Sequence, residues 1–282
     1  MIELKNLSEK DIESMDYNQL IGITKETNRP PGGIESVIHV ANSIFLNKDS
    51  KVLEIGTSTG FTAIELSKLI QCKIKAIDVN EISLEEAKNR AQKEGINNVE
   101  FIKADATNLP FENEYFDLVF CGNVTSLISD RKKALDEYSR VLKKNGFIAA
   151  IPMYYVNEPS KDLLKNVSDA IKVDIKAQYK QEWIKFFNIP NLEYYRIYDY
   201  VFEKKSEDVI NLFVDNIIKR PHLNELNVEA RKMLNKKYKQ YIHLFNENLS
   251  HMGFSIMLLR KKPEYDQDPE LFTAVEAKNE NH

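Results

Sequence analysis

The sequence predicts an α/β protein built on a doubly wound, mostly parallel, seven-stranded sheet with helices on both faces. Two observations lead to this prediction. Between residues 51 and 152, short β-rich runs alternate with longer helical patterns, and strands joined in this way by helices form parallel βαβ units. The strand-like runs are also apolar enough to be covered on both faces, which is typical of a parallel sheet.

Five strands and three helices are expected in this stretch. The strands are predicted at residues 52–55, 73–78, 99–103, 116–121 and 147–152, and the helices at 61–70, 83–95 and 130–146. Ser83 and Glu86 have the spacing of a capping box, which predicts the start of the second helix, and Gly95 is expected to end it. Asp130 is expected to begin the third helix.

Helices are also predicted on either side of this stretch. Residues 9–24 and 34–46 have helical patterns, and two prolines followed by two glycines separate them at residues 30–33. Near the other end, residues 192–202 and 254–259 resemble a pair of strands. Two further helical patterns, 206–219 and 226–249, lie between those strands, so we expect a helical insertion there.

The expected domain organisation has four parts. Residues 1–48 form an N-terminal helical cap, and residues 49–203 together with 252–263 form the core. Residues 204–251 form the insertion, which is predicted to act as a lid or as the surface of a homodimer. The polar tail, residues 264–282, is predicted to be poorly ordered.

Composition narrows the classes of function. The 282 residues carry a net charge of −4, which argues mildly against a dedicated nucleic-acid binder. The two cysteines, Cys72 and Cys121, lie in apolar stretches and have no metal-ligand spacing, which is typical of a reducing compartment. The first residues show no signal-peptide pattern, and no apolar run is long enough to span a membrane. We therefore expect a cytoplasmic protein.

The turn after the first strand carries the most information about chemistry. Gly56 and Gly60 permit a tight turn and a close approach of a ligand to the backbone. Such a turn also serves dinucleotides, but Glu54 would repel a pyrophosphate and suits a ligand that carries an ammonium and a sulfonium. S-adenosylmethionine has both groups. The alternative is a structural turn beside a solvated glutamate.

Two more carboxylates follow the next two strands. Asp78 ends the second strand, where a carboxylate would accept hydrogen bonds from both ribose hydroxyls of an adenosine. Asp105 follows the third strand and could accept a hydrogen bond from the adenine amino group. Each aspartate alone is as well explained by a turn cap. Carboxylates at three successive strand ends, however, favour a ligand site at the carboxyl edge of the sheet.

With Asp117 and the turn at residues 142–147, these residues resemble the class I S-adenosylmethionine-dependent methyltransferases, in the branch that methylates small molecules. The resemblance covers about residues 30–155. It implies that Glu54 binds the methionine ammonium, Asp78 the ribose, and Asp105 the adenine. It further implies cofactor contacts from Gly56, Thr57, Ser58, Gly60, Val79 and Ala106. Ser58 stands where the family often has glycine.

Asn123 follows the fourth strand and is expected beside the transferring methyl group, in the cofactor pocket or against the substrate. A turn-forming asparagine is an equal alternative. Enzymes of this class that methylate amino groups of nucleic acids commonly carry an Asn/Asp-Pro-Pro-aromatic run here. This chain does not, which argues against methylation of adenine or cytosine amino groups but leaves other RNA or protein targets open. A small-molecule acceptor is expected, and no nucleic-acid partner.

The residues that contact the substrate are less clearly indicated by the sequence. Tyr154 and Tyr155 follow the fifth strand and are predicted to contact the substrate, with Trp183 on the far wall. Any one of these rings is more often part of a core. Tyr17 and Arg29 are expected to close over the cofactor. No catalytic base is specified, and no cluster of side chains has metal-ligand spacing.

Two other functions compete with a methyltransferase at this stage. An NAD-dependent oxidoreductase would share the turn and Asp78, but it explains neither Glu54 nor Asp105. A non-catalytic module that binds an adenosyl ligand would keep the loop without an enclosed substrate pocket. The sequence does not specify the methyl acceptor or the atom methylated.

Overall fold

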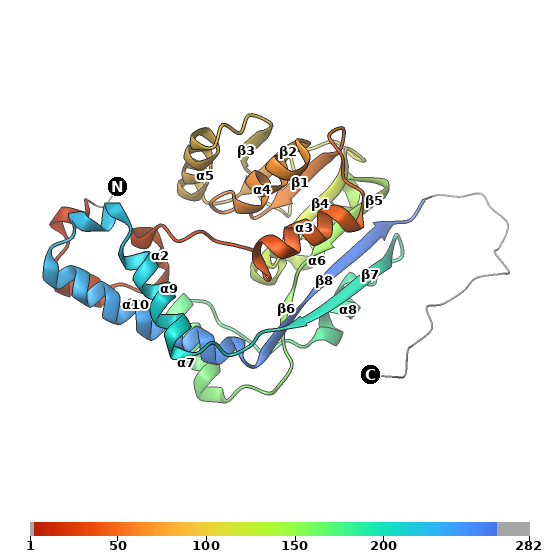
Figure 1. Cartoon of the computed structure of the whole chain (residues 1–282). Coiled ribbons are helices and arrows are strands. Elements are labelled where there is room, and N and C mark those ends of the chain that lie inside the picture. The colour runs from red at the N-terminus through yellow and green to blue at the C-terminus, as the bar shows by residue number, and fades with distance from the viewer. Residues whose placement is uncertain (1–2, 264–282) are drawn as a thin grey trace.

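One twisted sheet organises the larger part of the molecule (Figure 1). The structure, a computed structural model, describes residues 3–263. The strands are β1 (Lys51–Ile55), β2 (Lys73–Asp78), β3 (Val99–Lys103), β4 (Phe116–Gly122), β5 (Leu142–Ala150), β6 (Met153–Tyr155), β7 (Leu192–Val201) and β8 (Met252–Lys261). Strands β1 to β5 are parallel in the order 3-2-1-4-5, and β8 is antiparallel to β5, β6 and β7. The predicted α/β fold is confirmed.

The short strand β6 is a continuation of β5. Ala150 pairs with Met257 and Met153 pairs with Phe254, so β5 and β6 run in succession along the same edge of β8. Pro152 lies between them and has no N–H to donate to the ladder, which explains the interruption. The sheet therefore corresponds to the seven predicted strands, one of which is divided.

Helices cover both faces of the sheet. On one face, α3 (Gly33–Ser43) and α4 (Phe61–Ile70) bury apolar side chains against β1, β4 and β8. On the other face, α6 (Arg131–Val141) and α8 (Lys180–Phe187) do the same. The helix α5 (Glu81–Lys93) packs beside β2 and β3. Both faces are thus removed from water, as the apolar strands require.

The starts of two helices test the predicted caps. The predicted capping box of Ser83 and Glu86 is wrong: Asn80 caps α5, because its side-chain oxygen accepts hydrogen bonds from the amides of Ile82 and Ser83. The helix therefore begins directly after the strand. Asp130 does cap α6, by accepting from the amide of Lys133 at 3.0 Å.

Five helices form a second unit, called here the helical layer, which lies beside the sheet (Figure 1). They are α1 (Glu9–Ser14), α2 (Tyr17–Thr24), α7 (Lys161–Ile171), α9 (Glu207–Ile218) and α10 (Val228–Leu249). Three short 3₁₀ turns, η1 (Leu4–Asn6), η2 (Val124–Leu127) and η3 (Pro221–Glu225), complete the helical elements of residues 3–263. α1, α2, α9 and α10 share an apolar core of their own, while α7 packs on α2 and α10.

The helical layer divides the chain differently from the expected domain boundaries. The predicted helix over residues 9–24 is two helices, because Asp16 starts a new one by capping the amide of Gln19. Of the N-terminal helices, α3 packs on the sheet, whereas α1 and α2 pack on the insertion. α7 lies within the range expected for the core, yet it packs on the insertion. The predicted tail, residues 264–282, lies outside the described residues.

We expect the helical layer to lose stability when its own core is disturbed. Leu234 on α10 is fully buried there, so Leu234→Ala should destabilise the layer by about 2–5 kcal/mol. In hydrogen exchange, the amides of α1, α2 and α9 should then exchange faster than those of β1 and β4. Leu212→Ala on α9, where the side chain is 65% exposed, is the control. Equal acceleration in the sheet would contradict two separate cores.

Candidate functional site

The turn between β1 and α4 has a backbone that few residues can adopt. Gly56, Ser58 and Gly60 all have positive φ, at 69°, 47° and 82°. A Cβ atom added at Gly56 would lie 2.4 Å from a methyl carbon of Val124, so a side chain would not fit. Ser58 is an L-residue in the left-handed region, which explains why a glycine often stands there in the family that this sequence resembles.

Glu54 lies under this turn and is almost completely buried. Its Oε2 atom accepts hydrogen bonds from the Thr57 hydroxyl at 2.6 Å and from the Ala63 amide at 3.1 Å. Burial raises the pKa of Glu54 to about 7, although hydrogen bonds from Thr57, Thr62 and Ala63 oppose the shift. No ion pair of Glu54 exists among residues 3–263. A buried carboxylate without a cation suits a positively charged ligand.

Asp78 at the end of β2 is joined to the same turn. Its Oδ2 atom accepts a hydrogen bond from the Ser58 amide at 2.8 Å, and its Oδ1 atom accepts one from the Asn80 amide at 2.8 Å. The turn-capping role considered from the sequence is therefore present. Each oxygen keeps a further lone pair for a ligand hydroxyl. The neighbouring Val79 side chain is 66% exposed, which leaves an apolar surface beside the carboxylate.

Asp105 lies after β3 at the same edge of the sheet. Its Oδ1 atom accepts hydrogen bonds from the amide and the hydroxyl of Thr107, both at 2.8 Å, and these bonds lower the pKa of Asp105. The carboxylate is exposed, while Ala106 beside it is buried. The structure thus brings Glu54, Asp78 and Asp105 to the carboxyl edge of three neighbouring parallel strands.

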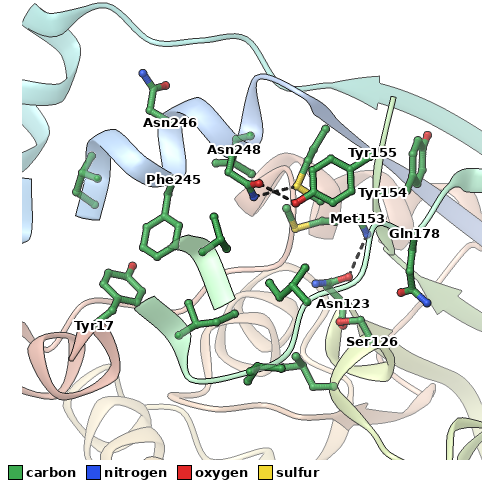
Figure 2. Close-up of a pocket in the computed structure, with 18 of the residues that line it drawn as sticks. Tyr17, Asn123, Ser126, Met153, Tyr154, Tyr155, Gln178, Phe245, Asn246 and Asn248 are labelled. Carbon is green, nitrogen blue, oxygen red and sulfur yellow. Dashed lines mark hydrogen bonds between the residues drawn. The ribbon is translucent and has the colours of Figure 1, made fainter. Parts of the chain in front are cut away.

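A cavity of about 820 Å³ lies between the ends of β4 to β6 and the helical layer (Figure 2). Sixteen of its 27 lining residues are aliphatic, aromatic or methionine, so the wall is largely apolar. The other eleven lining residues are polar or charged, among them Asn123 at the end of β4 and Asn248 on α10. The wall includes Tyr17, Glu26, Asn123, Tyr154, Tyr155, Phe245 and Asn248.

Asn123 has a structural hydrogen bond and also lines the cavity. It follows β4 and precedes η2, and its Oδ1 atom accepts a hydrogen bond from the Met153 amide at 3.0 Å. The side chain therefore ties the ends of β4 and β6 together. It also lines the cavity, where Figure 2 shows it beside Met153 and Ser126.

Tyr154 and Tyr155 both reach the cavity wall, but their hydroxyls are engaged with protein groups. The Tyr155 hydroxyl donates to Asn248 at 2.7 Å (Figure 2), and the Tyr154 hydroxyl lies 2.9 Å from that of Ser255. Burial raises the pKa of both phenols, which keeps them protonated near neutral pH. They can shape a ligand pocket, whereas a role as a base does not suit them.

Trp183 is the predicted substrate contact that the structure does not place at the cavity. Its ring is buried and stacked against Phe187, and its indole N–H donates to the carbonyl of Met153 at 3.3 Å. Its neighbours Met153 and Arg131 line the cavity instead, and the Arg131 guanidinium lies 5.3 Å from the Trp183 ring centroid. The prediction of Trp183 as a wall residue is corrected, since its ring is packed in the hydrophobic core.

The segment that joins α2 to α3 crosses the cofactor turn. The Arg29 guanidinium lies over the ring of Phe61, 5.2 Å from its centroid, and Phe61 directly follows Gly60. Pro30 lies 3.9 Å from the position that a Cβ atom would occupy at Gly122. The sequence predicted closure by Tyr17 and Arg29. Tyr17 lines the cavity instead, and only Arg29 lies near the turn.

Sequence reasoning missed most of the wall that the helical layer provides. Glu26, Phe245 and Asn248 line the cavity, and no motif marks them. Phe245 and Asn248 lie on α10 and Glu26 follows α2, so their position at the cavity is visible only when the packing of these segments is known. Within residues 3–263 no group of three or more His, Cys, Asp or Glu side chains could hold a metal ion. In the same range, no helix has the length and apolar character that crossing a membrane requires.

Comparison with known proteins shows the family to which the chain belongs. The family described as "Methyltransferase domain" matches residues 46–190, just over half of the chain. An uncharacterized protein of Haemophilus influenzae is 32% identical over 62% of this chain and 70% of its own. A demethylmenaquinone methyltransferase of Staphylococcus epidermidis is 28% identical over 54% of this chain and 67% of its own. The crystal structure of MccD protein covers 83% of this chain and 100% of its own, with a TM-score of 0.73 and 25% identity.

The effect of crowding at Gly56 can be separated by mutation from the effect of its positive φ. Gly95 has the same φ of 69°, but no atom lies within 4 Å of an added Cβ. Gly95→Ala should therefore cost only the left-handed strain, about 1 kcal/mol. Gly56→Ala should cost more and weaken the binding of S-adenosylhomocysteine, measured by thermal unfolding and calorimetry. Equal effects of the two substitutions would show that the space at Gly56 has no importance.

Proposed function

Since this chain belongs to the methyltransferase domain family and is an S-adenosylmethionine-dependent methyltransferase, we propose a division of its site. The edge formed by β1, β2 and β3 holds the cofactor. The cavity under the helical layer holds a small, largely apolar methyl acceptor. The family decides against the NAD-dependent oxidoreductase and the non-catalytic module that were weighed from the sequence.

The observation that supports the cofactor site is the buried Glu54 carboxylate, which has no cationic partner among the described residues. The methionine ammonium of the cofactor would supply that charge. Asp78 would accept from the ribose hydroxyls, with Val79 against the sugar and base. Asp105 and Ala106 would border the adenine. The backbone of Gly56, Thr57, Ser58 and Gly60 would lie along the cofactor, and Asn123 would stand at the reacting end.

Methyl transfer then depends mainly on alignment. S-adenosylmethionine, when bound, supplies a methyl group on a positively charged sulfur. The chain's own residues must hold the nucleophilic atom of the acceptor in line with that bond and exclude water. Asn123 is fixed by its bond to Met153, so it can hold one edge of the acceptor without moving. Tyr155 is fixed in the same way by Asn248.

The acceptor class follows from the cavity wall. An interior of about 820 Å³ accommodates a small organic molecule of drug-like size, and its largely apolar lining favours a ring or a chain of carbon atoms. Demethylmenaquinone, named for one relative, is an acceptor of that description. We therefore propose an acceptor with an apolar body and a hydroxyl, amine or activated carbon as nucleophile. A homodimer and a cytoplasmic location stay predictions, and light scattering on the purified chain tests the first.

Cofactor binding should depend on pH through Glu54. With a pKa of about 7, Glu54 is protonated below that pH, and it must ionise to hold the ammonium. The affinity for S-adenosylhomocysteine should therefore fall as pH drops below about 7, approaching tenfold per pH unit, and level off above it. Calorimetry in buffers of different ionisation enthalpy should show a proton released on binding.

Glu54→Gln should bind S-adenosylhomocysteine more weakly at pH 8 and lose the pH dependence. Glu81→Gln is the matched control, because Glu81 lies at the same edge of the sheet and is exposed. It should keep the wild-type affinity at every pH. An affinity that stays unchanged in Glu54→Gln would refute the proposed ammonium contact.

The acceptor proposal is tested with a labelled methyl donor and a panel of dihydroxynaphthalene, naphthol, tyramine and, as polar comparison, glycine. The wild type should methylate the aromatic compounds and leave glycine unmodified. Phe245→Ala removes an apolar wall that packs on Tyr17, so KM for the aromatic acceptors should rise about tenfold or more while S-adenosylhomocysteine affinity holds. Val228→Ala, exposed on the same helix, should change neither. Preference for glycine would refute an apolar acceptor.

A further inference from the structure

We propose that Glu26 is the catalytic base, which takes the proton that the acceptor's nucleophilic atom loses during methyl transfer. This inference rests on the proposed acceptor cavity and assigns a residue to a step that the sequence left without one. Glu26 follows α2, lines the cavity and is partly buried. The other carboxylate that lines the cavity, Asp174, is exposed to solvent.

The position of Glu26 is fixed by the fold. The Tyr238 hydroxyl on α10 donates to its Oε2 atom at 2.5 Å, and the Arg220 guanidinium donates to the carbonyls of Thr24 and Lys25 just before it. No hydrogen bond to its Oε1 atom occurs within residues 3–263. One oxygen of the carboxylate is therefore held by the protein, and the other is left to accept a proton.

Glu26 lies on the segment that leads to the reacting end of the cavity. Pro30 lies against Gly122, the residue before Asn123, and three residues separate Glu26 from Pro30. The Cα atoms of Glu26 and Pro30 are therefore at most about 14 Å apart. Tyr17, which feels the charge of Glu26, borders the same cavity as Asn123 (Figure 2).

The surroundings of Glu26 suit a base. Burial raises its pKa, while the hydrogen bond from Tyr238 and the charges of Arg220 and Arg29 oppose the shift. A carboxylate with a raised pKa accepts a proton more readily than one in water. Tyr17 also faces Glu26, and burial raises the pKa of that phenol well above its ordinary value, so it stays neutral.

The proposed proton transfer accompanies methyl transfer with all atoms and electrons conserved. The nucleophilic atom of the acceptor gives an electron pair to the methyl carbon, and the electrons of the breaking sulfur–carbon bond stay on sulfur. The proton on the nucleophilic atom moves to Glu26, whose carboxylate becomes a neutral carboxylic acid. The products are the methylated acceptor and S-adenosylhomocysteine, and Glu26 later returns its proton to water. No oxidant or further reactant is required.

The test compares an acceptor that has a proton to lose with one that has none. Iodide attacks a methyl group without losing a proton, so its conversion to methyl iodide, measured in the headspace by gas chromatography, needs no base. Glu26→Gln should lower kcat for dihydroxynaphthalene by about 100-fold or more and leave iodide methylation and S-adenosylhomocysteine affinity unchanged. The control is Glu13→Gln, an exposed carboxylate on α1, which should change none of the three.

Two results would overturn the proposal: an unchanged kcat for dihydroxynaphthalene in Glu26→Gln, or an equal fall for dihydroxynaphthalene and iodide. A second variant tests the same assignment through pH. Tyr238→Phe removes the hydrogen bond that holds the pKa of Glu26 down, so the acidic limb of the kcat profile should move to higher pH. A limb that does not move would also refute it. Failure of the acceptor proposal is distinct, because it would appear as absent turnover by the wild type.

Discussion

The hydrogen bonds of Glu54 are the interaction on which the rest of the cofactor edge depends. One oxygen of this carboxylate joins Thr57 in the turn to Ala63 in the first turn of α4. It therefore satisfies one of the amides that a helix leaves without a partner at its start, and it holds the turn closed from below. Asp78 then holds the same turn from the side, through Ser58. Two carboxylates and three residues with positive φ thus fix the backbone before any ligand arrives.

The wall of the acceptor cavity is formed in a different way from the cofactor edge. It comes from helices that are far apart in the sequence, and the helical layer has an apolar core separate from the sheet. The two units meet around Asn123, Met153 and Tyr155, whose polar groups are already paired with protein atoms. A rigid cofactor edge is thereby combined with a wall whose residues can change without disturbing the sheet. This arrangement suits one reaction used on different acceptors.

The sequence allowed the fold and the proximity of three carboxylates to be predicted because both depend on local patterns. Glu54 and Asp78 lie near the ends of their strands and Asp105 follows the next strand, and parallel pairing brings the three to one edge. The cavity wall depends on contacts between distant segments, such as Tyr238 with Glu26, which no local pattern reveals. Trp183 was misplaced for the same reason, since a buried aromatic ring and a pocket ring have the same residue type. The cap of α5 was missed because Asn80, directly after the strand, competed with the box at Ser83.

The position of β8 has a consequence for how the protein is made. This strand pairs with β5, β6 and β7, yet it is the last strand within residues 3–263, and the insertion of two long helices precedes it. During synthesis, the edge of β5 stays open until about residue 261 has left the ribosome. The growing chain therefore presents an unpaired apolar strand edge while the residues between β5 and β8 are synthesised. Long-range pairing of this kind makes the final step of sheet assembly slow compared with the folding of the helices.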